Sequence, residues 1–210
     1  MKITKLGHCC LLIETKGTRI LTDPGSFTVE AHSKLENIDF ILFSHEHQDH
    51  YHLESLKVIL KKNPKALVFA NDSVSKMLTK EGVEHAMVMN GHKFQMGDVG
   101  AIGIGEKHAP MHSSIPLSSN LGFFIDDRLW YPGDAFTDPM RVVEILALPV
   151  SGPWLTIGQA IDYALLLKPK FTFPVHDGIR FGSAHIFTEK ILNPSGISFV
   201  PMVEGDSKEF

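Results

Sequence analysis

Residues 38–50 read IDFILFSHEHQDH, and this stretch decides both the fold and the chemistry expected of the chain. Its first part, 38–43, is apolar apart from Asp39, as expected of a strand buried on both faces. Directly after that strand, the pattern H-x-H-x-D-H brings together His45, His47, Asp49 and His50. In an extended segment His45 and His47 project to the same side. Imidazoles and a carboxylate on a rigid strand end suit Zn²⁺, with Mn²⁺ or Fe²⁺ as alternatives.

Three later segments also carry His or Asp at the end of an expected strand. They are 105–108 (GEKH) after strand 99–104, 131–134 (YPGD) after strand 129–131, and 174–178 (PVHDG) after strand 171–173. A catalytic ion needs further ligands and one open position. Because strand ends on one rim of a sheet converge, we expect these segments to meet the first cluster.

The rest of the chain alternates β and helical patterns and predicts an α/β fold. Strands come first, then strand–helix pairs, then strands and strand–helix pairs again, an order that predicts two mixed sheets packed together with helices outside. We expect a single domain spanning 1–210. The expected strands are 2–6, 10–14, 18–22, 66–70, 93–96, 99–105, 121–126 and 143–148, and the expected helices are 53–60, 72–80 or 73–80, 157–167 (capped by Thr156) and 184–192.

The composition excludes several classes of protein. Apolar residues make up 43% and charged residues 21% of the 210 residues, and the formal charge is −4, so we expect no nucleic-acid partner. No apolar run is long enough to cross a bilayer, and His8 and Glu14 interrupt the opening segment, so we expect neither a membrane partner nor a signal peptide. The two cysteines, Cys9 and Cys10, are adjacent, which indicates small core residues rather than ligands and favours a cytoplasmic location.

These motifs resemble those of the metallo-β-lactamase superfamily, from Leu6-Gly7-His8 to His176-Asp177-Gly178. The chain is most similar to the ascorbate-6-phosphate lactonase-like branch, whose broader group includes the phospholipase D that acts on N-acyl phosphatidylethanolamines. The features that carry the resemblance are G-H-x-[CS] at 7–10, I-L-T-D-P at 20–24, P-G-D at 132–134 and P-V-H-D-G at 174–178. The resemblance implies a four-layer αβ/βα sandwich with metals at the edge between the two sheets.

The resemblance also implies how two divalent metal ions are held. His45, His47 and a histidine of the middle loop would bind the first ion. Asp49, His50 and His176 would bind the second, and Asp134 would bridge the two. The middle ligand is either His108, directly after its strand, or His112 in the segment MHSS.

Two residues outside these segments have both a structural and a functional interpretation. His8 is either a buried histidine of the first strand pair or a catalytic residue that polarises the substrate or relays a proton. Asp23 either orients a ligand histidine from behind or forms the turn before Pro24.

The predicted function is hydrolysis of an ester, lactone or phosphodiester by a hydroxide that two metal ions activate, with Asp49 and His8 as catalytic residues. One alternative is a diiron oxidoreductase of the same fold, but flavodiiron relatives carry Glu where His47 stands. Another is a metal-stabilised binding protein without turnover. We expect a small-molecule substrate, which the metal ions allow to be anionic, bound by loops 25–34 and 110–120. Because a second domain is not expected, a symmetric homo-oligomer is a reasonable expectation.

Overall fold

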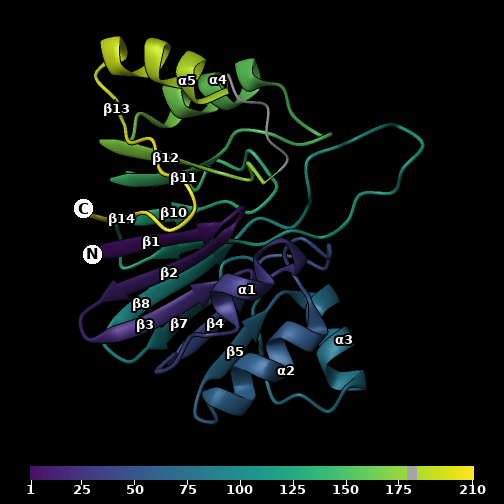
Figure 1. The fold of residues 1–210 in the computed structure, drawn as a ribbon. Helices are drawn as coiled ribbons and strands as arrows, with labels where there is room; N and C mark the ends of the chain where they lie inside the picture. Colours follow the sequence, from purple (N-terminus) through teal and green to yellow (C-terminus); the bar gives the residue numbers. More distant parts are fainter. Residues whose placement is uncertain (179–183) are drawn as a thin grey trace.

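The computed structural model describes residues 1–178 and 184–210, and within them the strands form two sheets (Figure 1). The first sheet is mixed, because its strands β1 to β3 run antiparallel and β3 to β6 run parallel. Its strands, in spatial order, are β14 (Ser207–Glu209), β1 (Lys2–Gly7), β2 (Cys10–Thr15), β3 (Thr18–Thr22), β4 (Phe40–Phe43), β5 (Leu67–Ala70) and β6 (Ala86–Met87).

The second sheet has the same mixed plan. Strands β7 to β10 pair antiparallel, and β10 to β13 pair parallel. In spatial order its strands are β13 (Ser198–Phe199), β12 (Phe171–Val175), β11 (Ile145–Pro149), β10 (Leu129–Tyr131), β9 (Gly122–Ile125), β8 (Val99–Ile104) and β7 (Lys93–Met96).

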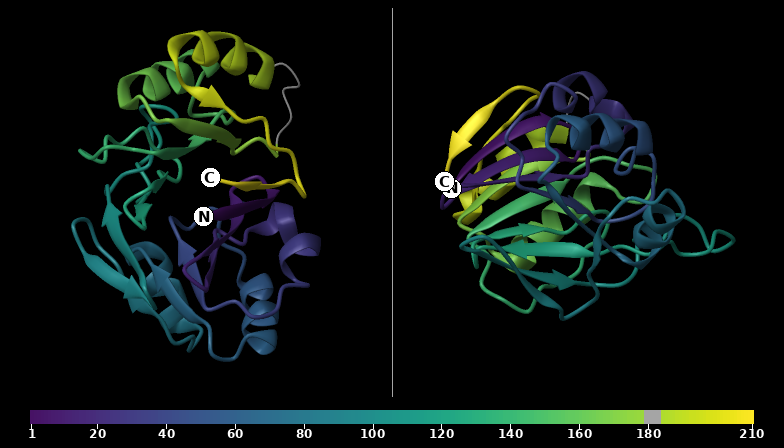
Figure 2. Two further views of the ribbon diagram at one scale, coloured as in Figure 1. Left: turned by 90° about the vertical axis from the view of Figure 1, so that its left-hand side faces the viewer. Right: turned by 90° about the horizontal axis from the view of Figure 1, so that it is seen from below.

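Helices cover the outer face of each sheet, so the predicted four-layer sandwich is confirmed (Figure 2). The first sheet carries α1 (Val29–His32), α2 (Leu53–Lys62) and α3 (Asp72–Lys80), and the second carries α4 (Ile157–Leu167) and α5 (Ala184–Leu192). Short 3-10 turns lie at Ser26–Thr28 and Asn193–Ser195. In the described part of the chain, no helix has the length and apolar character needed to span a membrane.

Three apolar cores hold the four layers together. The central core lies between the sheets and includes Ile13 and Phe123, both fully buried. A second core packs Leu56 of α2 and Leu78 of α3 against the first sheet. The third packs Ala164 of α4 against the second sheet. The alternation of strand side chains explains this division, since residues two apart face the same core.

The sequence predicted the bounds of most elements to within two residues, but the predicted N-cap of α3 was wrong. Asp72 or Ser73 was the expected N-cap of α3, but Asn71 caps the helix, because its side chain accepts a hydrogen bond from the Val74 amide. The expected cap of α4 is confirmed: Thr156 and Gln159 form a reciprocal capping box. The short elements α1, β6, β13 and β14 were not expected from the sequence.

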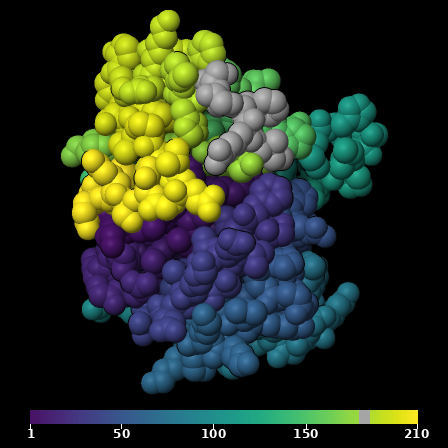
Figure 3. Space-filling view, viewed as in Figure 1, coloured from purple at the N-terminus to yellow at the C-terminus, as the bar shows by residue number. Residues whose placement is uncertain are grey.

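The two ends of the chain meet at the edge of the first sheet. Strand β14 pairs antiparallel with β1, and the amide of Phe210 donates to the Met1 carbonyl at 2.9 Å. Figure 3 shows the C-terminal residues, in yellow, lying against the N-terminal ones, in purple. The pairing covers an otherwise open edge of the sheet.

The turn after β3 approaches the H-x-H-x-D-H loop so closely that only glycine fits at position 25. A Cβ on Gly25 would lie 1.9 Å from the carbonyl oxygen of Asp49. We expect Gly25→Ala to lower the free energy of unfolding by about 1–3 kcal/mol or more, because backbone must move. Urea denaturation measures this. The control Gly158→Ala, where a Cβ meets nothing closer than 3.8 Å, should be neutral or slightly stabilising; equal effects would contradict the explanation.

Candidate metal centre

Strand ends from both sheets bring their polar side chains to one rim. The loop after β4 carries His45, His47, Asp49 and His50. From the second sheet, His108 follows β8, Asp134 follows β10 and His176 follows β12. The convergence expected of strand ends is therefore what the structure has.

One group of four donors draws two residues from each sheet. His45, His47, His108 and Asp134 each offer an atom, and these atoms all lie within 4.8 Å of one another. The Nε2 of His45 is 3.0 Å from the Nδ1 of His47. Asp134 Oδ2 lies 3.8 Å from His45 Nε2 and 3.3 Å from His108 Nε2.

A second group surrounds the other side of the Asp134 carboxylate. Asp134 Oδ1 is 3.2 Å from His50 Nε2, and Asp134 Oδ2 is 2.9 Å from His176 Nε2. The carboxylate of Asp49 closes the group, at 3.5 Å from His176 Nε2 and 3.8 Å from His50 Nε2. One carboxylate thus faces both groups of donors.

The donor atoms fit divalent ions at both positions. Ligands about 2.1 Å from a tetrahedral ion lie about 3.4 Å from one another, close to the separations found here. Among the described residues, His50 Nε2, His108 Nε2 and Asp134 Oδ1 are buried without a hydrogen-bond partner. Buried atoms left unpaired in this way need an explanation, and a cation between them supplies one.

Oxygen atoms behind four of the histidines fix the direction of their rings. Each holds the Nδ1 nitrogen and so leaves Nε2 facing the centre, as hydrogen-bond partners of metal-binding histidines do in metal proteins. The pairs are His45 with Ser44 Oγ at 3.0 Å, His50 with Asp23 Oδ2 at 2.7 Å, His108 with the Ala109 carbonyl at 2.6 Å and His176 with the Ser151 carbonyl at 2.5 Å.

Asp23 accepts several hydrogen bonds in the buried network behind the candidate metal centre. It is fully buried, and its carboxylate accepts from the Ser44 amide at 2.7 Å and from the Ser44 and Tyr131 hydroxyls at 2.5 Å each. Together with its contact to His50, these bonds bear out the expectation that Asp23 stands behind a candidate ligand histidine.

His8 contacts the centre through Asp49. The amide of Gly178 donates to His8 Nδ1 at 3.1 Å, so the proton of the neutral ring is on Nε2, 3.0 Å from Asp49 Oδ2. Burial lowers the pKa of His8 and favours this neutral form. The geometry makes His8 a donor that holds the Asp49 carboxylate.

Three of these residues hold backbone conformations that non-glycine residues rarely adopt. The φ angles are 46° at His8, 38° at Asp23 and 56° at His176. Such left-handed conformations cost free energy and cluster at functional sites, where the surrounding structure enforces them.

Asn120 supports the turn that carries Asp134, and no motif in the sequence pointed to it. Its side-chain oxygen accepts from the Asp134 amide at 2.9 Å, and its side-chain nitrogen donates to the Pro132 carbonyl at 2.9 Å. The only sequence signal was its place just before an apolar strand. Ser151 orients His176 through its backbone carbonyl, and a contact of this kind leaves no motif in the sequence.

The middle-loop alternative is decided by burial and position. His108 is 3% exposed and points its Nε2 at Asp134. His112 is exposed, and its Nδ1 lies 2.8 Å from the Ser114 hydroxyl. The structure brings His108, and not His112, into the cluster.

The buried charges of His50, His176 and Asp134 shift one another's pKa values. Burial would lower the pKa of His50 and His176, but the Asp134 carboxylate raises both well above the ordinary value. Burial would raise the pKa of Asp134, but His50 and His176 hold it well below its usual range. Without metal, the centre therefore holds protons on imidazoles that a cation must displace.

This coupling predicts a pH dependence of metal binding. A raised imidazole pKa stabilises the metal-free fold below about pH 6.5, and that contribution is lost as pH rises through the raised value. Metal competes with the same protons, so the increase in melting temperature on adding Zn²⁺ should be larger at about pH 8 than at about pH 6. Calorimetry with and without metal measures it, and a shift that is larger in acid would contradict the assignment.

A cleft of about 330 Å³ opens over the two donor groups. Its floor includes His47, Asp49, His108, Asp134 and His176. The walls are largely apolar and include Phe27, Met111, Pro153 and Trp154. Phe27 and Met111 belong to the two loops expected to contact substrate, so sequence position alone identified part of these walls.

Comparisons with known proteins identify the family of the chain. The sequence model of the beta-lactamase superfamily domain matches residues 2–176. A UPF0173 protein of Pyrococcus abyssi is 33% identical, over 88% of this chain and 87% of that protein. A UPF0173 metal-dependent hydrolase of Nanoarchaeum equitans is 28% identical, over 84% of this chain and 83% of that protein. Igni18, a metallo hydrolase of Ignicoccus hospitalis, shares the fold with a TM-score of 0.78 at 22% identity, over 100% and 98% of the two chains.

The matched region contains every residue of the two donor groups, since it runs from β1 to His176 at the end of β12. The length of the match to the family model and the shared fold support the same family assignment. The chain therefore belongs to the metallo-β-lactamase superfamily, as an enzyme of its metal-dependent hydrolase class.

Proposed function

We propose that the chain hydrolyses an ester, lactone or phosphodiester bond in a small molecule, with two divalent ions at the floor of the cleft. The observation that carries the proposal is the pair of buried donor groups that share the Asp134 carboxylate. Two such ions would polarise the scissile bond and lower the pKa of a water molecule toward neutrality.

The residues divide between the two ions. His45, His47 and His108 would hold the first ion, and Asp49, His50 and His176 the second, with Asp134 between them. This assignment agrees with the ring directions, because four of the histidines present Nε2 to the centre.

His8 and Asp49 would act together on the attacking water. Asp49 lines the cleft, and its carboxylate accepts from His8 Nε2. Burial opposes ionisation of Asp49, but the contacts of His176 and His8 lower its pKa, so it stays ionised at neutral pH. An ionised Asp49 accepts a hydrogen bond from the attacking water and orients it, while His8 positions that carboxylate. The apolar walls at Phe27 and Trp154 would exclude bulk water from the reaction.

The sequence resemblance to ascorbate-6-phosphate lactonase-like enzymes favours a lactone or a phosphorylated sugar acid as substrate, and the donor types favour zinc, with manganese or iron as alternatives. A carboxylate-bridged set of imidazoles accepts several divalent ions, and zinc suits the high proportion of nitrogen donors. The cleft volume of about 330 Å³ agrees with a small molecule.

The test is a metal-reconstitution assay on the full chain. Protein stripped with a chelator and reloaded with Zn²⁺, Mn²⁺ or Fe²⁺ is assayed on panels of esters, lactones and phosphodiesters. We expect turnover of at least one class that disappears on chelation and returns with metal. Fully loaded protein that turns over none of the three classes would refute the proposal and favour metal-dependent binding.

A further inference from the structure

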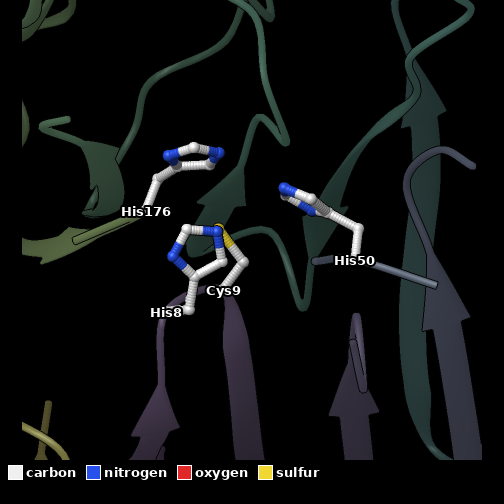
Figure 4. A group of neighbouring side chains, drawn as sticks. All are labelled: His8, Cys9, His50 and His176. Atoms are coloured by element: carbon white, nitrogen blue, oxygen red, sulfur yellow. The ribbon is translucent and has the colours of Figure 1, made fainter. Parts of the chain in front are cut away.

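A cysteine sulfur lies near two of the histidines proposed to bind the second ion. His8, Cys9, His50 and His176 each offer one ligand atom, and these four atoms lie within 4.8 Å of one another (Figure 4). We infer that Cys9 Sγ is a direct ligand of the second ion, whose donors are then sulfur, nitrogen and oxygen together. This inference rests on the proposed two-metal centre and adds a ligand to it.

The two adjacent cysteines have different surroundings. Cys9 lies in the turn between β1 and β2, and Cys10 is the first residue of β2. Cys9 faces the central core and the rim, whereas Cys10 belongs to the core beneath α2 and α3. Both are buried, at 1% and 0% exposure, but only the Cys9 sulfur belongs to a donor group among the described residues.

The backbone holds Cys9 against the centre. The Leu11 amide donates to the Thr22 hydroxyl at 3.1 Å, and that hydroxyl donates to the Cys9 carbonyl at 3.0 Å. These bonds tie the Cys9 peptide to the end of β3. In Figure 4, the sulfur lies behind the His8 ring, with the rings of His50 and His176 on either side.

Among the described residues, His50, which belongs to the same group of donors as Cys9, has a buried nitrogen without a hydrogen bond. His50 is fully buried, and within the described residues its Nε2 has no hydrogen-bond partner. For a metal–sulfur bond of about 2.3 Å and a metal–nitrogen bond of about 2.1 Å, tetrahedral ligand atoms lie about 3.6 Å apart. The four donor atoms lie within 4.8 Å of one another, so they must approach by about 1 Å to bind one ion.

A thiolate ligand would change which metals the centre prefers. Sulfur is a softer donor than imidazole or carboxylate, so it favours Zn²⁺ and Co²⁺ over Mn²⁺. Binding requires the thiolate, so the thiol proton leaves to solvent as the metal–sulfur bond forms. The carboxylates of Asp49 and Asp134 alone would discriminate less between these ions.

Cobalt substitution tests the inference with a matched pair of variants, Cys9→Ser and Cys10→Ser. Wild type and Cys10→Ser loaded with Co²⁺ should show a near-ultraviolet sulfur-to-cobalt charge-transfer band. Cys9→Ser should lack this band while retaining visible cobalt bands, and its preference for Zn²⁺ over Mn²⁺ should fall by about 10-fold or more.

Each outcome decides the question. Cobalt-loaded wild type without the band, or Cys9→Ser with an unchanged band, would overturn the Cys9 assignment and leave the two-metal centre standing. Wild type that binds no cobalt would overturn the centre itself. If Cys9→Ser does not fold, X-ray absorption of zinc-loaded wild type decides instead: a sulfur neighbour at about 2.3 Å supports the ligand, and a shell of only nitrogen and oxygen rejects it.

Discussion

Replacing Asp134 with asparagine is expected to reduce bound metal to well below one ion per chain and to lower hydrolysis by more than about 100-fold. Loss of a group behind the ligands typically costs about 10- to 100-fold, and Asp134 itself faces both ion positions. Its carboxylate lies within 3.8 Å of the Nε2 atoms of four histidines. Elemental analysis of purified protein measures the metal.

Matched variants make this result specific. His45→Ala and His176→Ala should each lower the metal content as well, because each removes a donor from a different group. His85→Ala should not, since among the described residues His85 belongs to no donor group, and its Nδ1 lies 2.8 Å from the Val83 carbonyl. Unchanged metal in Asp134→Asn, His45→Ala and His176→Ala together would end the proposed assignment.

The variant Asp23→Ala is expected to lower the free energy of unfolding by about 3–5 kcal/mol, which would make it the most destabilising single change considered. It would leave the buried hydrogen-bond donors of Ser44, Tyr131 and His50 without their acceptor. Because His50 would lose the group that orients it, metal affinity should also fall by about 10- to 100-fold. Denaturant titration and metal titration measure the two effects.

Asp39→Ala is the control for Asp23→Ala. Asp39 is exposed, and its side-chain carboxylate accepts a hydrogen bond from the Arg19 amide at 2.8 Å. Its replacement should cost less than about 1 kcal/mol and leave metal affinity unchanged. An Asp23→Ala protein as stable as Asp39→Ala would show that the buried network does not support the centre.

Elements with a strong apolar pattern could be predicted from the sequence, whereas weakly patterned pairings could not. The apolar run at 38–43 and the capping residue Thr156 gave β4 and α4. Strand β14 consists of three exposed residues, Ser207–Glu209, so it has no apolar alternation to reveal it. Its partner β1 lies about 200 residues away in the chain, a distance over which local propensity says nothing.

The same division applies to the candidate site. The dense motif at 45–50 and the histidine and aspartate at three later strand ends identified the residues that meet at the rim. Asn120 and Ser151 could not be found this way, because they act through an amide and a backbone carbonyl that belong to no motif. Cys9 was expected in the core, and it is buried there, but its nearness to His176 depends on how the two sheets pack.

Anomalous X-ray diffraction from crystals of the zinc-loaded protein tests the central claim most directly. The account predicts two zinc peaks about 3.5–4 Å apart at the floor of the cleft, on either side of Asp134. One peak should lie among His45, His47 and His108, and the other among Asp49, His50 and His176. A single peak, or zinc bound only elsewhere on the chain, would contradict a two-metal centre.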